Sequence, residues 1–201
     1  MLLQPTRESS MLTAKGFFIV SVMLVLTGAA AFGQDPSSST PSSAVPSAAL
    51  LEGLGAEAAM NLANAWGMNN DENRVTTWTT SRELHFEFPD GTRTIIPMPD
   101  DRMLVSVAPY IMKTHPCKKH FPSACRGELA NTPVEVTAVT VDGKVILDQK
   151  TRTLPNGFVD LWLPRNLTID ITLKARGLTA TQRIGTFDTD KTCITEPKLH
   201  P

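Results

Sequence analysis

The chain has 201 residues, of which 19% are charged, and its formal net charge at pH 7 is −1. A near-neutral chain gives no sign of the cationic surface that nucleic acids or anionic membranes attract, so we expect neither as a partner. No Ser-His-Asp arrangement, phosphate-binding loop or paired-carboxylate site stands out, and we predict that the protein is not an enzyme. The length fits one domain, or one domain with a small appendage.

The first residues have the features of a secretory signal peptide. Lys15 precedes a continuous apolar run from Phe17 to Leu26, and small residues follow up to Ala31 and Gly33. A basic segment, a short apolar run and small residues follow one another in this order in signal peptides. The run is shorter than the about 20 residues that span a bilayer. We therefore predict that residues 1–33 are a cleaved signal peptide and that the protein is exported.

A flexible tether and a helix are expected next. Residues 34–47 are rich in serine and proline and cannot bury a core, which is typical of a flexible tether. Ser47 is a suitable residue to begin a helix, and Gly67 is suitable to end one. A helix between them would carry one apolar face. The residues of that face are Leu51, Leu54, Ala58, Leu62 and Ala65.

From Arg82 onward the hydrophobic pattern has a period of two, as in half-buried strands. Turn signals such as Asp90-Gly91, Asp142-Gly143 and Asn156-Gly157 recur between the alternating segments. This pattern predicts antiparallel strands joined by short turns. The expected strands are residues 82–88, 92–96, 103–108, 134–141, 144–149, 158–163, 168–174 and 178–184.

The expected fold class is mostly β with a small N-terminal α part. We predict an antiparallel β-sandwich preceded by a helix and a hairpin. The order of elements from Gly127 to Leu163 is similar to prealbumin-like and carboxypeptidase-regulatory-like sandwiches, which says nothing about chemistry. We place a small N-terminal α+β region at residues 48–101 and the sandwich domain at residues 102–201.

Potential metal ligands are concentrated in eleven residues, from His115 to Cys125. This segment holds two of the three cysteines and two of the four histidines, and the third cysteine is Cys193. The chain contains no C-x-x-C motif, so neither a thioredoxin-type redox pair nor a zinc ribbon is indicated. Pro116 and Pro122 favour an irregular loop over a helix.

Three cysteines in an exported chain leave one unpaired if a single disulfide forms. A structural disulfide between Cys193 and one loop cysteine would leave the other thiol and both histidines without a role. A metal site would use all of them: zinc prefers four ligands in a tetrahedron, whereas Cu(I) needs only two or three soft ones. Thiols could also reduce Cu(II) to Cu(I). From the residues alone, both the disulfide and the metal site stay open.

Several separated motifs around this segment agree in order and spacing with one known family. They lie between residues 98 and 193 and comprise Met98-Pro99-Asp100-Asp101-Arg102, Ser106-Val107-Ala108-Pro109-Tyr110, Thr114-His115-x-Cys117-x-x-His120, Cys125-Arg126-Gly127-Glu128-Leu129, Asn156-Gly157-Phe158, Trp162-Leu163-Pro164-Arg165 and Thr192-Cys193. In these motifs the chain resembles the CueP family of periplasmic copper-binding proteins. The pair Lys118-Lys119 departs from the family pattern.

The resemblance implies a metal site made of Cys117, Cys125 and Cys193, assisted by His115 and His120. It implies copper as the metal, held as Cu(I) or taken up as Cu(II), with zinc a weaker candidate because thiolates are soft ligands. It further implies a periplasmic homodimer that buffers copper, contributes to copper resistance, and delivers copper to a client protein such as a periplasmic copper/zinc superoxide dismutase. The sandwich domain at 102–201 would then be the copper-binding domain.

Two other functions remain as alternatives. A disulfide-stabilised exported sandwich could bind a protein or sugar partner, and a thiol oxidoreductase could bind copper only incidentally. A cysteine cluster in an oxidising compartment stays reduced only under a bound metal or a reductase, so a periplasmic thiol reductase is a further expected partner.

Other histidines, methionines and one acid are weaker candidates. We expect His85 to be solvated on a strand and His200 to be frayed, while a tail folded back beside Cys193 would let His200 reach the metal, so His200 stays open as a ligand. Met103 should pack in the core, while Met112 lies closest to the cluster and stays open as a ligand. Glu128 could accept a hydrogen bond from a ligating histidine or be a plain surface carboxylate.

Overall fold

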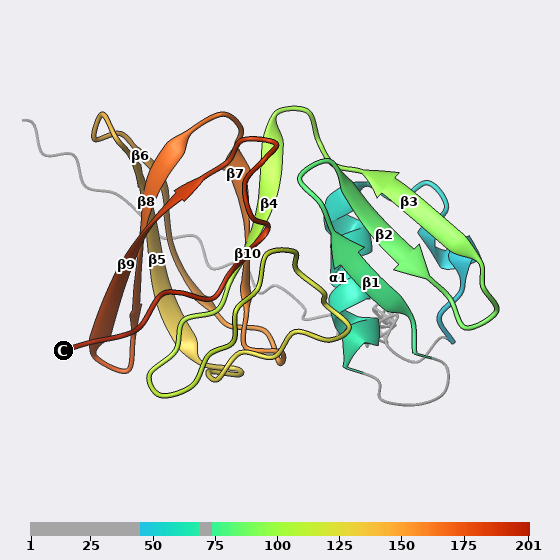
Figure 1. Ribbon diagram of the computed structural model, residues 1–201, viewed down its shortest axis with the longest axis horizontal. Coiled ribbons are helices and arrows are strands. Elements are labelled where there is room, and N and C mark those ends of the chain that lie inside the picture. Colours follow the sequence, from blue (N-terminus) through green and yellow to red (C-terminus); the bar gives the residue numbers. More distant parts are fainter. Residues whose placement is uncertain (1–44, 69–73) are drawn as a thin grey trace, which may run out of the picture. The chain divides into compact units, whose positions relative to one another are not determined.

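The computed structural model describes residues 45–68 and 74–201 (Figure 1). The predicted signal peptide at 1–33 lies outside the described residues, as does the predicted tether except for its last three residues. Within the described part, none of the helices is long and apolar enough to cross a membrane.

The described residues form two short helical segments and ten strands. In chain order these are η2 (Ala48–Leu51), α1 (Ala56–Gly67), β1 (Thr76–Thr79), β2 (Glu83–Glu87), β3 (Arg93–Pro97), β4 (Arg102–Val107), β5 (Pro133–Thr140), β6 (Val145–Arg152), β7 (Val159–Pro164), β8 (Thr168–Ala175), β9 (Leu178–Gly185) and β10 (Cys193–Ile194).

Seven of these strands form the two sheets of a sandwich. One sheet has the order β10-β4-β7 and the other has the order β6-β5-β8-β9. Neighbouring strands are antiparallel, except that β10 runs parallel to β4. In β8 buried and partly exposed residues alternate, so that Ile169, Ile171 and Leu173 reach one core with residues of both sheets. The predicted fold class, mostly β with an antiparallel sandwich after a helix and a hairpin, is confirmed.

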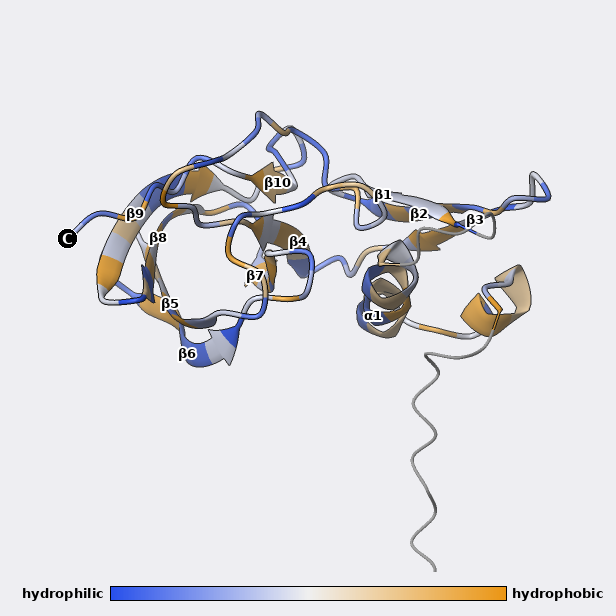
Figure 2. Ribbon diagram, turned by 90° about the horizontal axis from the view of Figure 1, so that it is seen from below, coloured by the Kyte–Doolittle hydropathy of each residue, from blue (hydrophilic) through white to orange (hydrophobic). Residues whose placement is uncertain are grey.

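The N-terminal region has its own small core between a helix and a sheet. The strands β1-β2-β3 form an antiparallel sheet, and α1 packs on one face of it (Figure 2). Leu84 and Phe86 of β2 point toward the helix, where Trp66 packs edge-on against Phe86 with ring centroids 6.0 Å apart. The helix therefore buries its apolar face within this region.

The predicted apolar helix face is confirmed only in part: Leu51, Leu54 and Leu62 pack against the N-terminal core, but Leu51 and Leu54 do not lie on one continuous helix with the other residues. Gly53 has φ +73°, which ends the helical conformation after η2, and α1 begins only at Ala56. The residues that α1 buries are Ala56, Ala59, Met60, Ala63, Trp66 and Gly67, whereas the predicted Ala58 and Ala65 are exposed. The large side chains Met60 and Trp66 set the buried face, because burying them removes far more apolar surface than burying two alanines. The predicted end of the helix at Gly67 is confirmed.

The eight predicted strands are present as β2 to β9, but β1 and β10 were not predicted. The core residues fall into three clusters: one in the N-terminal region, to which Leu104 of β4 contributes, one in the sandwich, and a small third one formed by Ala108, Cys125, Phe158 and Cys193. The domain boundary at residue 101 stays a prediction.

Candidate metal centre

The candidate ligands His115, Cys117, His120 and Cys125 lie on the connection between β4 and β5, which contains no regular strand among its described residues 108–132. The Glu128 carboxylate fixes the start of this loop. Its Oε2 accepts hydrogen bonds from the backbone N–H groups of residues 111, 112 and 113, at 2.7, 2.8 and 3.1 Å. These three bonds lower the pKa of Glu128, against a burial effect that raises it. Glu128 is therefore a backbone anchor.

The loop turns sharply before Cys125. The carbonyl of Phe121 accepts hydrogen bonds from the N–H groups of Ala124 and Cys125, at 2.8 and 2.7 Å. The N–H of Phe121 in turn lies 3.4 Å from Cys125 Sγ and donates to it. This turn brings the Cys125 sulfur back toward the earlier part of the loop.

The free edge of β1 forms hydrogen bonds with the centre of the loop. The N–H of Thr79 donates to the carbonyl of His120 at 2.9 Å. Two residues away, the Thr77 N–H donates to Ser123 Oγ at 3.0 Å and the Ser123 N–H donates to Thr77 Oγ1 at 3.2 Å. The loop thus satisfies backbone groups that an edge strand would leave unpaired.

The end of α1 presses against the same loop. A Cβ at Gly67 would lie 2.3 Å from the carbonyl oxygen of Pro122, so only glycine fits there. Arg126 joins the two segments, since its guanidinium donates to the carbonyls of Gly67 at 2.7 Å and Cys125 at 2.8 Å. Arg74 adds a hydrogen bond to the carbonyl of Ser123. The N-terminal region is therefore part of what positions the ligands.

Two glycines allow the loop to approach the start of β7. Gly157 has φ +85°, and a Cβ there would lie 2.5 Å from the carbonyl oxygen of Gly127. The Gly127 N–H donates to the Asn156 carbonyl at 2.6 Å. This backbone-to-backbone contact places the following Phe158, which is fully buried, beside the ligand loop.

Cys193 comes from a different part of the chain. It lies on β10, opposite Ser106 of the parallel neighbour β4, and is fully buried. The preceding Thr192 ties this strand to the loop, because its Oγ1 accepts a hydrogen bond from the His120 N–H at 3.1 Å. The same hydroxyl accepts from Thr79 Oγ1 at 2.9 Å. Thr192 thus connects three separate segments at the site.

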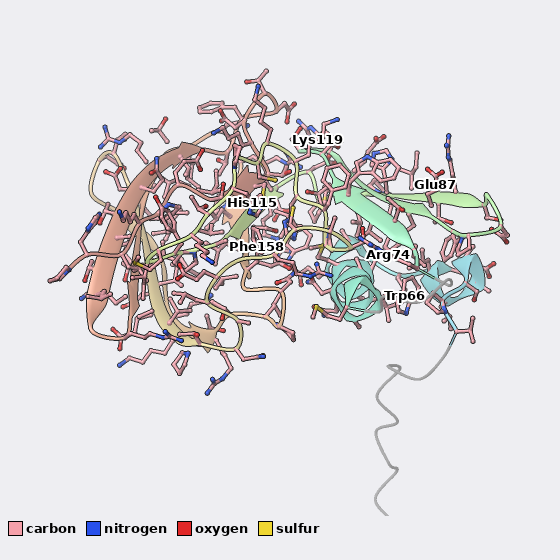
Figure 3. All side chains as sticks on the ribbon, turned by 60° about the horizontal axis from the view of Figure 1, so that its bottom comes forward. Trp66, Arg74, Glu87, His115, Lys119 and Phe158 are labelled. Atoms are coloured by element: carbon pink, nitrogen blue, oxygen red, sulfur yellow. The ribbon has the colours of Figure 1, made fainter. Side chains whose placement is uncertain are left out.

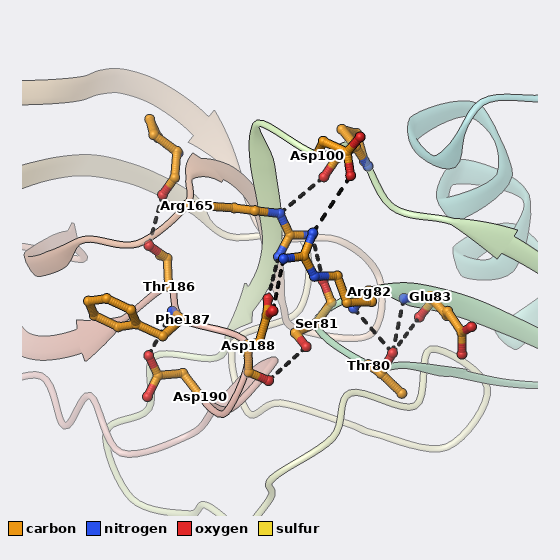
Figure 4. Close-up of polar contacts among 12 residues, drawn as sticks. Thr80, Ser81, Arg82, Glu83, Asp100, Arg165, Thr186, Phe187, Asp188 and Asp190 are labelled. Carbon is orange, nitrogen blue, oxygen red and sulfur yellow. Dashed lines mark hydrogen bonds and ion pairs between the residues drawn. The ribbon is translucent and has the colours of Figure 1, made fainter.

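The approach to β10 is held by charges (Figure 4). Asp188 forms ion pairs with Arg82 at 2.8 Å and with Arg165 at 3.3 Å. The side chain of Arg165 is only 3% exposed and also donates to the carbonyls of Ser81 and Pro99, at 2.6 and 3.1 Å. This cluster links the N-terminal region, the end of β7 and the segment that leads to Cys193.

The predicted ligand atoms come together in two groups that share Cys125. His115, Cys117 and Cys125 form one group, and His120, Cys125 and Cys193 form the other; within each group the ligand atoms lie within 4.8 Å of one another. The Sγ atoms of Cys117 and Cys125 are 3.6 Å apart, and Cys193 Sγ lies 3.9 Å from His120 Nδ1. The structure therefore brings all five predicted ligands into one neighbourhood.

The environment of these atoms fits a soft metal ion. All three cysteines are free thiols. His120 is fully buried, and its Nε2 has no hydrogen-bond partner among the described residues. A buried polar nitrogen without a partner is unusual in a folded protein and points to a missing ligand. Three thiols beside imidazole nitrogens are the donor set that Cu(I) and zinc prefer.

The three thiols differ in their pKa values. The hydrogen bond from Cys193 lowers the pKa of Cys125, and His120 adds to that effect. The same contact and burial raise the pKa of Cys193, while burial is the main cause that raises the pKa of Cys117. The arrangement stabilises a thiolate at Cys125, which is the sulfur that the two groups share.

The weaker candidates lie in other surroundings. The ring of His85 stacks on Trp78 with centroids 4.7 Å apart and its side chain is 16% exposed, so it is less solvated than predicted. His200 is exposed but not frayed, because its backbone pairs with Thr179 of β9 in both directions. Met103 packs in the core as predicted, and Met112 is 79% exposed.

Sequence reasoning missed the residues that position the ligands rather than bind them. Thr192, Ser123 and Arg126 act through hydrogen bonds to backbone groups far away in the chain. Thr192 and Arg126 stand in the family motifs, but the sequence does not show what their side chains contact, and polar residues of these types are common.

The comparisons with known proteins agree with this geometry. The chain matches the family described as periplasmic copper-binding protein CueP over residues 68–198. It is also similar to a solved structure described as "Crystal Structure of S.CueP", with 30% sequence identity and a TM-score of 0.69, over 78% of this chain and 100% of that chain. No curated protein matches the chain. The matched segment contains all five candidate ligands, and the chain belongs to the CueP family of periplasmic copper-binding proteins.

Proposed function

We propose that this protein holds Cu(I) in the periplasm through Cys117, Cys125 and Cys193, with His115 and His120 as further ligands. The observation that carries the proposal is the convergence of these five side chains from two distant segments into two groups with a common sulfur. The burial of Cys193 and His120 would shield a bound ion from water and from competing ligands. Shielding of this kind suits storage and controlled transfer of a reactive ion.

The cluster would also supply electrons for the reduction of Cu(II). Two thiols that join in one disulfide release two protons and two electrons, which reduce two Cu(II) ions to Cu(I). Cys117 and Cys125, with sulfurs 3.6 Å apart, are one pair that could form that bond after a small movement. The disulfide would have to be reduced again before the cluster could bind Cu(I) fully, so a periplasmic thiol reductase belongs to this proposal as a partner.

Membership of the family supports a proposal for the cellular role. We infer that the protein is exported by a cleaved signal peptide, forms a homodimer, contributes to copper resistance, and delivers copper to a client such as a periplasmic copper/zinc superoxide dismutase. Delivery would proceed by ligand exchange, because Cu(I) binds two or three soft ligands and can accept a client ligand before it loses one of its own.

Anaerobic titration of the reduced protein with Cu(I), in competition with a coloured Cu(I) chelator, tests copper binding. We expect one Cu(I) per chain, and a loss of at least about tenfold in affinity for Cys125→Ser. Met112→Leu is the matched control, since Met112 is an exposed sulfur-bearing residue of the same loop and should leave the affinity unchanged. A reduced wild-type protein that cannot compete with the chelator would overturn the proposal.

Addition of Cu(II) to the reduced protein, without oxygen, tests the reduction. We expect two Cu(I) ions to form for every two thiols lost, measured with the chelator and with a thiol reagent. Cu(II) that binds without loss of thiols would show that the protein stores copper but does not reduce it.

A further inference from the structure

The five candidate ligands differ strongly in their access to solvent. Cys193 and His120 are fully buried and Cys125 is 8% exposed. His115 and Cys117 are partly exposed and lie on the outer part of the loop. The group formed by His120, Cys125 and Cys193 is thus an inner position, and the group formed by His115, Cys117 and Cys125 is an outer position. The only ligand common to both positions is Cys125.

One aromatic ring packs beside the histidines of both positions. Phe158 is fully buried, with its ring centroid 4.5 Å from that of His120 and 6.5 Å from that of His115 (Figure 3). The closer contact is with His120, which Phe158 helps to hold in the inner group. Each histidine contributes to one group only.

The outer thiol does not depend on a metal for a partner. Cys117 Sγ donates a hydrogen bond to the carbonyl of Lys119 at 3.0 Å, two residues further along the loop. By contrast, the inner position is enclosed: Cys193 and His120 are fully buried, and His120 Nδ1 lies 3.9 Å from Cys193 Sγ. Buried ligand atoms shield a bound ion from water better than the partly exposed His115 and Cys117 do. The inner position is therefore the better place for an ion to stay.

We propose that the two groups are successive positions of one Cu(I) ion: it enters and leaves through His115, Cys117 and Cys125, and it resides with His120, Cys125 and Cys193. This inference rests on the proposed function, because it assumes that the cluster binds Cu(I). It assigns different roles to the ligands. Cys117 and His115 control the rate at which Cu(I) is exchanged, and Cys193 and His120 control the affinity for Cu(I).

The inward step exchanges one copper–sulfur bond for another. The Cys125–copper bond would persist, bonds to Cys193 and His120 would form, and the bonds to Cys117 and His115 would break. The proton that Cys193 loses is balanced by the proton that Cys117 takes up, and copper stays Cu(I) throughout. Because the shared sulfur never leaves the ion, copper is not released free at any stage, as Cu(I) transfer between proteins also requires.

Four variants measured in two ways test this division. The first measurement is the equilibrium affinity for Cu(I), and the second is the rate at which loaded protein gives Cu(I) to an excess of chelator in stopped flow. We expect Cys117→Ser and His115→Gln to slow the transfer by at least about tenfold while the affinity stays close to wild type. Cys193→Ser and His120→Gln should lower the affinity by at least about tenfold without slowing the transfer.

Substitution of the buried Cys193 or His120 could also disturb folding. His115 is partly exposed, so its substitution should leave the fold intact and keep the test decisive. X-ray absorption of the loaded Cys117→Ser protein should show the same number of copper–sulfur bonds as wild type. If His115→Gln and Cys117→Ser lower the affinity as much as the inner variants and leave the transfer rate unchanged, there is one position and the inference is overturned. A wild-type protein that does not bind Cu(I) at all would instead refute the proposed function.

Discussion

The loop and the strand that carry the candidate ligands are held in place by different kinds of interaction. Cys193 lies on β10, where its position is set by backbone pairing to β4 and by the sandwich core beside it. The loop ligands lie on a segment without a strand partner of its own, held by hydrogen bonds from single side chains such as Glu128, Ser123 and Arg126. Both segments nevertheless contribute ligand atoms to the same site, in which the atoms of each group lie within 4.8 Å of one another.

The difference indicates where the site is vulnerable. The pairing of the short strand β10 with β4 is made by backbone groups, such as the Ser106 N–H on the Thr192 carbonyl at 2.9 Å, which a side-chain substitution does not remove. In the loop, each contact depends on one residue, and its loss moves the ligands that it positions. Substitutions around the loop should therefore change the metal site more than substitutions of equal size around β10.

The largest effect is expected from Gly157→Ala. The left-handed backbone costs a residue with a Cβ about 1–2 kcal/mol, and the clash with the Gly127 carbonyl adds about 1–3 kcal/mol of overpacking. The free energy of unfolding, measured with urea, should fall by about 2–5 kcal/mol. Because Gly127 lies two residues after Cys125, the affinity for Cu(I) should fall as well.

Gly143→Ala is the matched control for this prediction. Gly143 has φ +88°, close to that of Gly157, but a Cβ there would meet nothing within 4 Å in the part of the chain that is described. It should cost only the backbone term of about 1–2 kcal/mol and leave Cu(I) affinity unchanged. Equal losses in the two variants would mean that the close approach of Gly127 and Gly157 contributes nothing.

A smaller effect is expected from Thr192→Val, which keeps the shape of the side chain and removes the hydroxyl that joins the loop to β10. The His120 N–H and the Thr79 hydroxyl would lose their acceptor in a buried place. An unsatisfied buried group costs about 1–3 kcal/mol, and the urea unfolding of the metal-free protein should show a loss of that size.

Thr181→Val serves as its control, because the Thr181 hydroxyl bonds to Thr172 on the exposed side of the β8–β9 pair. It should change the free energy of unfolding by less than about 0.5 kcal/mol. If Thr192→Val were equally harmless, the loop and β10 would be positioned independently of each other.

The sequence predicts the regular part of the fold well. Alternation between Leu84 and Phe88, and again between Ile169 and Leu173, marks strands because one face of each is buried. It fails for β1, whose four residues Thr76–Thr79 include one aromatic among threonines, and for the two-residue β10. Elements this short are formed by what they pair with, which no local pattern records.

The same distinction applies to the site. The ligand types are visible because cysteine and histidine are rare and concentrated. Their division between an inner and an outer position is not visible, since it depends on burial and on contacts such as that between Phe158 and His120. The helix face was predicted wrongly in part for a related reason. Gly53 interrupts the helix, and the burial of Trp66 then determines which side of α1 faces the core.

The smallest effect is expected from Asp188→Asn, near the strand side of the site. The hydrogen bond from Arg82 lowers the pKa of Asp188 in the folded protein below its unfolded value of about 3.9, and Arg165 contributes to the same shift. The stabilisation is therefore complete above about pH 4 and is lost as the pH falls through the folded pKa. Urea unfolding at pH 7 should show the variant to be less stable than wild type, and the difference should shrink below pH about 4.

Asp170→Asn, which removes an exposed partner of Arg183, should behave in the same way with pH but leave Cu(I) affinity untouched. A difference between Asp188→Asn and wild type that is constant from neutral to acid pH would show that the charge of Asp188 does not hold the approach to Cys193.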